Sequence, residues 1–171
     1  MACNVVLTGI TLDCSTNLSG VKEIFIADYN AVGSPDVSTG IMMIDKIDAS
    51  AGTFKRYQPA KYTGSLTKTL TKDESTGVKY YTNEAVAQFN KMETAKRSEL
   101  AQLDGGQLAA IVHDYNDKYW YLGKDNYVSA TAVTGQTGAG IDEGNFYTLT
   151  LTDISSELPY EVLASAVAEV I

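Results

Sequence analysis

The sequence has few of the residues on which catalytic and metal sites depend. It contains 2 cysteines, 1 histidine and 3 prolines in 171 residues. A zinc site needs about four Cys, His or carboxylate ligands, and His113 with Cys3 and Cys14 is a poor supply of them. We therefore expect no metal and no cofactor. We also expect both cysteines to stay reduced, as is usual in the cytosol.

Long hydrophobic runs are also missing. No stretch approaches the roughly 18 apolar residues that a membrane-spanning segment requires, and the run from Ile41 to Ile44 is far shorter. Met1 to Val5 lacks the basic and apolar regions of a secretory signal. The sequence thus predicts a protein made in the cytosol, not exported by this route and without a membrane partner.

Basic residues are outnumbered by acidic ones. The chain has 13 Lys and Arg against 21 Asp and Glu, which gives a net charge of −8. This balance disfavours a protein that grips nucleic acid, because phosphate binding depends on clustered Lys and Arg. The same charge suits a surface past which DNA slides without sticking.

Residues that favour β-strands are plentiful, with Thr scattered throughout and 11 Tyr. Short alternating segments are separated by turns rich in Gly, Asn and Asp. The pattern predicts a single domain, residues 1–171, of mainly β (α+β) structure: a β-sandwich or barrel with one packed helix. The expected strands are 5–12, 21–27, 53–62, 65–72, 78–82, 108–112, 119–122, 128–132 and 146–152, with a short apolar segment at 41–47, loops at 32–40 and 135–140, and a tail at 158–171.

The segment from Ser65 to Thr82 predicts a long hairpin with two polar faces. Threonines alternate with leucines and lysines along its first strand, which is the period of a β-strand. A polar turn at 73–77 leads into the second strand. Such strands bury little within one chain, and a neighbour often completes them.

Residues 84–103 allow two interpretations. As one helix, they place Ala85, Phe89, Met92, Leu100 and Leu103 along one stripe. Alternatively the strand continues to Phe89, and Asn90 caps a shorter helix with Glu93 three residues on. We favour strand followed by helix, with Gly105 and Gly106 ending the helix.

Catalytic chemistry is not indicated, and we expect a protein that is not an enzyme. His113 is next to Asp114 at a turn, but no Gly-x-Ser-x-Gly elbow accompanies it. The loop at 135–140 lacks the Lys-Ser/Thr ending of a phosphate-binding loop. Asp114, Asn116 and the pair 142–143 do not have the spacing of a calcium-binding EF-hand, so turn formation explains them better.

Aromatic residues gather on the return strand of a second hairpin. Tyr119, Trp120, Tyr121 and nearby tyrosines could stack on sugar rings, or they could supply a core and a protein interface. Trp120 points away from both neighbours in a strand, so one of the two faces should be buried. Core plus interface is the favoured interpretation of Tyr119, Trp120 and Tyr121.

Several segments together resemble virion structural proteins of tailed bacteriophages, of the crAss-like type that infects gut Bacteroides. The matching pieces are LTGITLDC (7–14), METAKR (92–97), KYWYLG (118–123), GQTG (135–138) and YTLTL (147–151), and residues 30–62 match nothing. The order of elements is also similar to that of tail-tube-like ring proteins.

The resemblance implies a β-sandwich or barrel with a flanking helix, and copies of the chain joined into a ring in the neck or tail, around a DNA channel. It makes Leu66 to Phe89 the ring-forming hairpin. The implied partners are further copies, neighbouring neck, tail or portal-associated proteins, and packaged DNA that passes without specific binding. The implied location is the virion, after synthesis in the host bacterial cytoplasm. The candidate interface residues are Leu66, Lys68, Leu70, Asp73, Glu74, Ser75, Tyr80 and Thr82.

A second function stays open on the sequence alone. A capsid-decorating or glycan-binding β-sandwich would use the aromatic face from Tyr119 to Tyr127.

Overall fold

Two apolar strands run through the centre of the molecule. β1 (Val21–Asp28) pairs antiparallel with β7 (Leu108–Asp114), and Ile24 lies opposite Val112. Most residues of both strands are buried. A strand that is covered on both faces is a nearly continuous apolar run rather than an alternating one, which explains the sequences VKEIFIAD and LAAIVHD.

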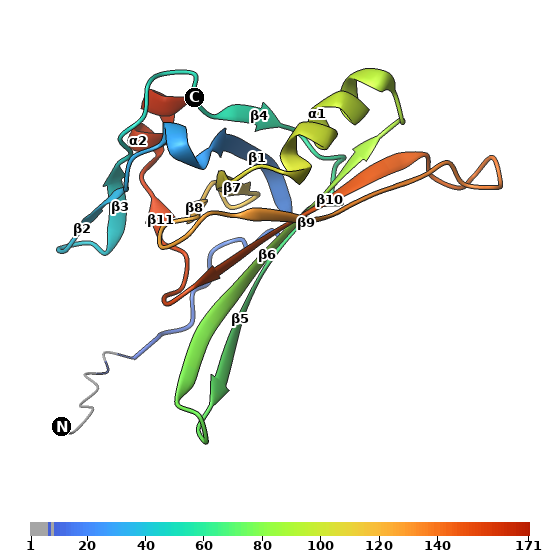
Figure 1. The fold of residues 1–171 in the computed structure, drawn as a ribbon. Coiled ribbons are helices and arrows are strands. Elements are labelled where there is room, and N and C mark those ends of the chain that lie inside the picture. The colour runs from blue at the N-terminus through green and yellow to red at the C-terminus, as the bar shows by residue number, and fades with distance from the viewer. Residues whose placement is uncertain (1–6, 8) are drawn as a thin grey trace.

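The computed structural model describes residues 7 and 9–171, which are mainly β, with 44% strand and 13% helix. The other strands are β2 (Asp36–Ser38), β3 (Met43–Lys46), β4 (Lys55–Tyr57), β5 (Ser65–Asp73), β6 (Val78–Asn90), β8 (Tyr119–Leu122), β9 (Ser129–Gln136), β10 (Phe146–Ser155) and β11 (Glu161–Val162), and Tyr29–Ala31 forms a 3-10 turn. A seven-stranded sheet has the order β2-β3-β11-β8-β7-β1-β4, and a four-stranded sheet has the order β5-β6-β10-β9 (Figure 1). The predicted mainly β class is confirmed, and neither sheet closes into a barrel in the described part of the chain.

Two hydrophobic cores lie on opposite faces of the seven-stranded sheet. On one face, Ile24 and Val112 pack in a cluster with Leu149 of the four-stranded sheet. On the other face, Phe25 and Ile111 belong to a separate cluster. The seven-stranded sheet is therefore the middle layer of the molecule.

Each core is completed by one helix. α1 (Thr94–Asp104) contributes Leu100 and Leu103 to the core between the sheets. α2 (Ala164–Val170) contributes Ala166, Val167 and Val170 to the core on the other face. The second helix was not predicted, because its short run of small and β-branched residues has a weak helical preference. Packing of α2 against the core stabilises it instead.

The choice of strand followed by helix over 84–103 is correct. β6 continues to Asn90, and α1 begins three residues after the predicted boundary. The predicted cap is wrong, because Asn90 is the last residue of the strand and Glu93 takes the cap position without a side-chain hydrogen bond. Gly105 ends α1 as predicted, and its N–H donates to the carbonyl of Leu103.

Other boundaries differ from the predictions. Residues 9–12 of the predicted strand 5–12 are in no strand, while Cys3 and most of residues 1–8 lie outside the described part. The predicted strand 53–62 is limited to β4, as expected from Pro59. Parts of the two predicted loops are strands instead. Residues 36–38 of the loop at 32–40 form β2, and residues 135 and 136 of the loop at 135–140 are the end of β9. Among the described residues, no helix has the length and apolar character needed to cross a membrane.

Candidate functional site

β5 and β6 of the four-stranded sheet form a long hairpin, and its distal half projects beyond the rest of the molecule (Figure 1). Its strands pair from Ser65 opposite Val86 to Asp73 opposite Val78. The proximal half of β6 is anchored, because Asn83, the alanines and Phe89 on its inner side are buried. Every residue from 69 to 79 is exposed. The prediction that this hairpin buries little is thus correct for its distal half and wrong for residues 83–89.

The hairpin tip is organised by its own side chains. Asp73 Oδ1 accepts hydrogen bonds from the backbone N–H of Ser75 at 2.9 Å and from its hydroxyl at 2.7 Å. These bonds from Ser75 lower the pKa of Asp73 to about 2. Gly77 has φ +72°, a conformation that favours glycine. Asp73, Glu74 and Ser75 therefore form a shaped turn at the end of a free hairpin.

The two faces of the four-stranded sheet differ in charge. Directly paired residues share a face, so the register separates an outer face from an inner face that continues into the core. Among the described strand residues of the outer face, none is Lys or Arg. The inner face of the hairpin carries Lys68, Lys72 and Lys79. The outer face includes Thr67, Thr69, Thr71, Tyr80, Thr82, Glu84, Val86, Gln88, Thr131, Thr134, Thr148, Thr150, Thr152 and Ile154.

Lys68 fastens the base of the hairpin to β8. Its Nζ lies 3.2 Å from the ring centroid of Trp120, an arrangement that favours attraction between cation and ring. Partial burial lowers the pKa of Lys68 to about 8, and the negative charges of Asp114 and Glu161 oppose this. The Trp120 Nε1–H donates to Asp114 Oδ2 at 3.1 Å. Lys68 therefore faces the body of its own chain, whereas Leu70 and Lys72 remain exposed.

The aromatic strand is used largely inside the chain. Tyr121 is buried in the core beneath α2, while Tyr119 stacks on His113 with ring centroids 4.2 Å apart. Trp120 points to the opposite face, as the strand period predicts, and packs against the other core. None of these three rings forms a flat exposed platform.

His113 occupies a structural position. Its Nε2 lies 3.1 Å from Asp117 Oδ1, and its Nδ1 lies 3.9 Å from Glu23 Oε2. Burial opposes ionisation of Glu23, but hydrogen bonds from Arg56 and Gln58 outweigh it and lower its pKa. Within the described residues, no three His, Cys, Asp or Glu side chains converge to hold a metal ion.

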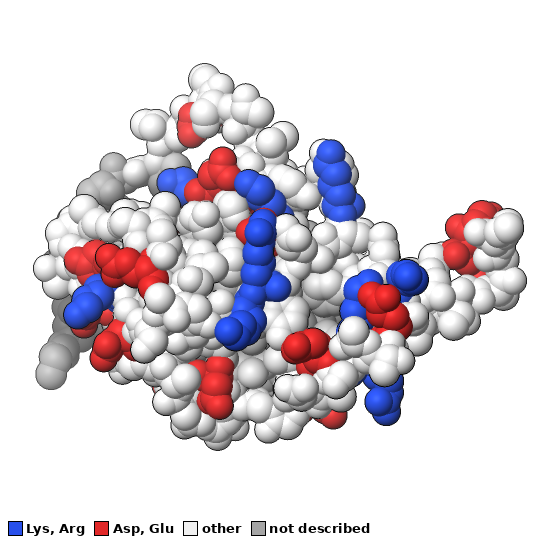
Figure 2. Space-filling view, turned by 90° about the horizontal axis from the view of Figure 1, so that it is seen from above, with Lys and Arg blue, Asp and Glu red and all other residues white. Residues whose placement is uncertain are grey.

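The glycine-rich segment forms a projecting arm, residues 137–145, between β9 and β10. The Glu143 carboxylate accepts a hydrogen bond from the N–H of Ala139, and the Glu143 N–H donates to the carbonyl of Gly140 at 3.1 Å. Seen from above, acidic side chains gather at the tip of this arm (Figure 2). Its backbone groups thus bond within the arm, which does not suit a phosphate cradle.

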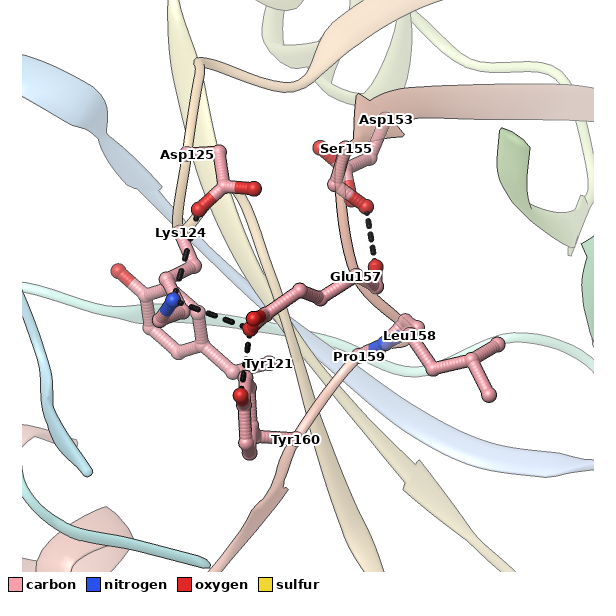
Figure 3. A pocket seen from close by; sticks show the side chains of 9 residues that line it. All are labelled: Tyr121, Lys124, Asp125, Asp153, Ser155, Glu157, Leu158, Pro159 and Tyr160. Carbon is pink, nitrogen blue, oxygen red and sulfur yellow. Dashed lines mark hydrogen bonds and ion pairs between the residues drawn. The ribbon is translucent and has the colours of Figure 1, made fainter. Parts of the chain in front are cut away.

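Sequence reasoning missed an acidic recess at the end of β10. Its wall includes Asp125, Glu157 and Asp153, together with Lys124 (Figure 3). The Lys124 ammonium lies 3.5 Å from Asp125 Oδ1 and 3.5 Å from Glu157 Oε2. Two carboxylates share one ammonium group, and Asp153 lines the same recess, so the recess carries an excess of acidic groups. The available signal was the polar pair Asp153 and Ser155 at inward positions of an alternating strand.

Asp153 is the buried member of this recess, with 2% of its surface exposed. Its Oδ2 accepts a hydrogen bond from Asn83 Nδ2 at 2.9 Å. Its Oδ1 has no hydrogen-bond partner in the described part of the chain. Burial raises the pKa of this carboxyl, and the Asn83 bond only partly opposes the shift.

We expect Asp153→Asn to stabilise the chain at neutral pH. Because the pKa of Asp153 is higher in the folded state than in the unfolded state, folding favours the protonated carboxyl. This group's contribution to stability is largest below its unfolded pKa of 3.8 and falls as the pH rises through the folded value. Melting curves of both chains from pH 4 to pH 8 should therefore diverge with rising pH and then run parallel. A constant difference at every pH would contradict this.

No protein-family model matches the sequence, and no curated protein matches it significantly. A weak structural neighbour is known. It is the SPP1 tail tube, solved by solid-state NMR and cryo-EM, with a TM-score of 0.40 and 15% sequence identity over 81% of this chain and 78% of that chain. The neighbour is thus a phage tail tube protein.

Proposed function

We propose that this chain is a structural, non-enzymatic subunit of a bacteriophage particle. In this proposal residues 1–171 act as one virion domain, and copies join into a ring in the neck or tail around the DNA channel. The observation that carries the proposal is the four-stranded sheet, which has two free edges and a long uncovered hairpin.

The strand directions in this sheet suit edge-to-edge closure. Each neighbouring pair in the order β5-β6-β10-β9 is antiparallel. With an even number of alternating strands, β9 of one copy runs antiparallel to β5 of the next copy when copies are related by rotation about an axis. In the described chain β5 pairs with β6 alone and β9 with β10 alone. Closure of a ring would satisfy both edges.

The outline of the sheet also suits a tilted barrel. The centre of β5 lies level with Ile154 of β10, and the centre of β9 lies level with Leu149 and Thr150. The offset of four to five residues is about 15 Å along the strands, across three strand spacings of about 14 Å. If successive copies continue this stagger around a ring, the strands are tilted by about 45° to the ring axis, close to the range of about 35–45° found in barrels.

The outer face of the sheet is suited to line a DNA channel. Its described strand positions carry hydroxyl groups and the carboxylates of Asp73 and Glu84 but no Lys or Arg. Without cations, such a surface lacks the positive charge on which phosphate binding chiefly depends, so DNA can pass without specific binding. The inner face, where the lysines lie, would point away from the channel.

The alternative function, a capsid-decorating or glycan-binding module, is less well supported. It needs exposed aromatic rings, and Tyr121 is buried, Tyr119 is stacked on His113, and Lys68 covers Trp120.

Shortening the hairpin tests the proposal. We would replace residues 70–81 by an Asn-Gly turn, which joins the paired residues Thr69 and Thr82 in register. We expect the chain to stay folded, because most of the removed residues are exposed, and to lose ring formation. Light scattering and negative-stain microscopy measure the rings, and a melting curve measures folding. Lys46→Ala on β3, outside the hairpin, is the control of unchanged length. Rings of normal size from the shortened chain would contradict the proposal.

A further inference from the structure

The end of the hairpin and the acidic recess lie at corresponding ends of the two free edges. Antiparallel contact between β5 of one copy and β9 of the next places the last residues of β5, around Lys72, beside the first residue of β9, Ser129. The chain reaches Ser129 from Asp125, which forms a wall of the recess. Strand direction decides which ends correspond, and the stagger of the sheet described above brings these two ends level.

The lysines and the carboxylates also lie on the same side of the sheet. Lys72 and Lys79 are on the inner face of the hairpin, as their direct pairing requires. Asp153 and Ser155 are inward residues of β10 and line the recess. In a sheet that continues from copy to copy, the hairpin lysines therefore face the recess and not the channel.

The hairpin lysines are poorly compensated within their own chain. Lys72 lies directly opposite Lys79 across the strands, and like charges in that position repel each other. Lys72 Nζ has an exposed ion pair with Glu74 Oε1 at 2.8 Å. Such an exposed pair contributes little to stability. An acidic surface from a second copy would compensate both lysines.

The recess has the opposite imbalance of charge, with more carboxylates than ammonium groups. It combines Asp125, Glu157 and Asp153 with a single ammonium, that of Lys124. Asp153 is almost fully buried, and its Oδ1 and the Oδ1 of Asn83 both lack hydrogen-bond partners in the described residues. Buried acceptors without donors are rare in native proteins. The accessible carboxylates at the mouth of the recess are Asp125 and Glu157, whose side chains are 31% and 54% exposed, and an incoming ammonium group would lower their energy.

We propose that the acidic recess formed by Asp125, Asp153 and Glu157 receives the lysine-bearing face of the β5–β6 hairpin, Lys72 and Lys79, of a second copy of this chain. The inference rests on the proposed ring. It adds the surface on which the hairpin docks and the interaction that orients it. The contact is heterologous, because the hairpin and the recess are different parts of the chain, and such contacts form a ring when the rotation between copies closes.

Reversing the charge of Lys72 tests this docking. In Lys72→Glu the new carboxylate lies opposite Lys79, which replaces a repulsive cross-strand pair by an attractive one. We expect the single chain to melt no lower than the wild type, while association weakens by about tenfold or more. Lys46→Glu on β3 makes the same charge change far along the chain from the hairpin and should leave association unchanged. A second change, Glu157→Lys, should restore association to Lys72→Glu.

Cross-linking keeps the inference testable if a charge variant fails to fold. With Cys3 and Cys14 replaced by Ser, a Lys79→Cys chain is mixed with a Glu157→Cys chain and treated with a short bismaleimide. We expect mixed dimers of the two chains, and none when Lys46→Cys replaces Lys79→Cys. Wild-type rings with equal association of Lys72→Glu and no mixed cross-link would overturn the docking but leave the ring. A wild-type chain that stays monomeric at all concentrations would overturn both.

Discussion

A chain with Leu149→Ala is expected to lose about 3–4 kcal/mol of its free energy of unfolding, the range found for large-to-small changes in packed cores. Leu149 is 0% exposed and lies in the core between the two sheets. It pairs with Ala87 and Val133 in the strand that joins the hairpin to the β9 edge. Since a domain is stable by only about 5–15 kcal/mol, this loss should also reduce ring formation at 37 °C.

Urea unfolding followed by fluorescence measures this loss. The matched control is Leu12→Ala, which removes the same atoms from a side chain that is 91% exposed. The control should change the free energy of unfolding by less than about 0.5 kcal/mol. Equal losses in the two variants would show that the four-stranded sheet does not pack on the central sheet as described.

Trp120→Ala is expected to cost about 2 kcal/mol, roughly half the cost of removing a fully buried aromatic ring. The ring contacts the core with one side and lies under Lys68 Nζ on the other. Its removal also leaves Asp114 Oδ2 without the indole donor. The variant should therefore hold the hairpin less firmly against β8 and form rings only at higher concentration.

Hydrogen exchange of β5 and β6 measures this loosening, alongside a melting curve. Tyr127→Ala, which removes a more exposed ring, is the control and should leave exchange in the hairpin unchanged. The Trp120→Ala variant also distinguishes the proposed ring protein from the sugar-binding module. A Trp120→Ala chain with unchanged stability and lost binding in a glycan screen would favour the sugar-binding module instead.

Much of the β structure could be predicted from local pattern. β10 alternates Leu149 and Leu151 with threonines because one face is buried and the other is not. β5 alternates in the same way, and the turn at Asp73 and Gly77 has residues that form turns by themselves. These features depend on neighbours within a few residues, so the sequence alone predicts them.

The errors fall where tertiary contacts outweigh local preference. α2 forms because Val167 and Val170 fill the second core, although its residues are weak helix formers. β6 extends to Asn90 because it pairs with β10 as far as Phe146, and this pairing overrides the capping pattern at Asn90. These contacts join residues far apart in the chain, and the local pattern of a single sequence does not reveal them.

The candidate interface could be predicted only in part. The hairpin residues Leu70, Asp73, Glu74 and Ser75 are exposed at its distal end, and their place in an interface between copies stays a prediction. Lys68 belongs instead to the contact with Trp120. The acidic recess was missed because Asp125 is far along the chain from Asp153 and Glu157, and the three meet only where β10 ends.

The sequence by itself determined that this is a mainly β chain of net charge −8, with a polar hairpin and no recognisable catalytic motif. Alternation, turn residues and charge are local properties or sums over the chain, and folding does not change them. Only the tertiary structure decided which strands lie at the free edges, which face of the sheet lacks lysine, and where the carboxylates meet. Those depend on long-range pairing, where a shift of one residue moves every side chain to the other face.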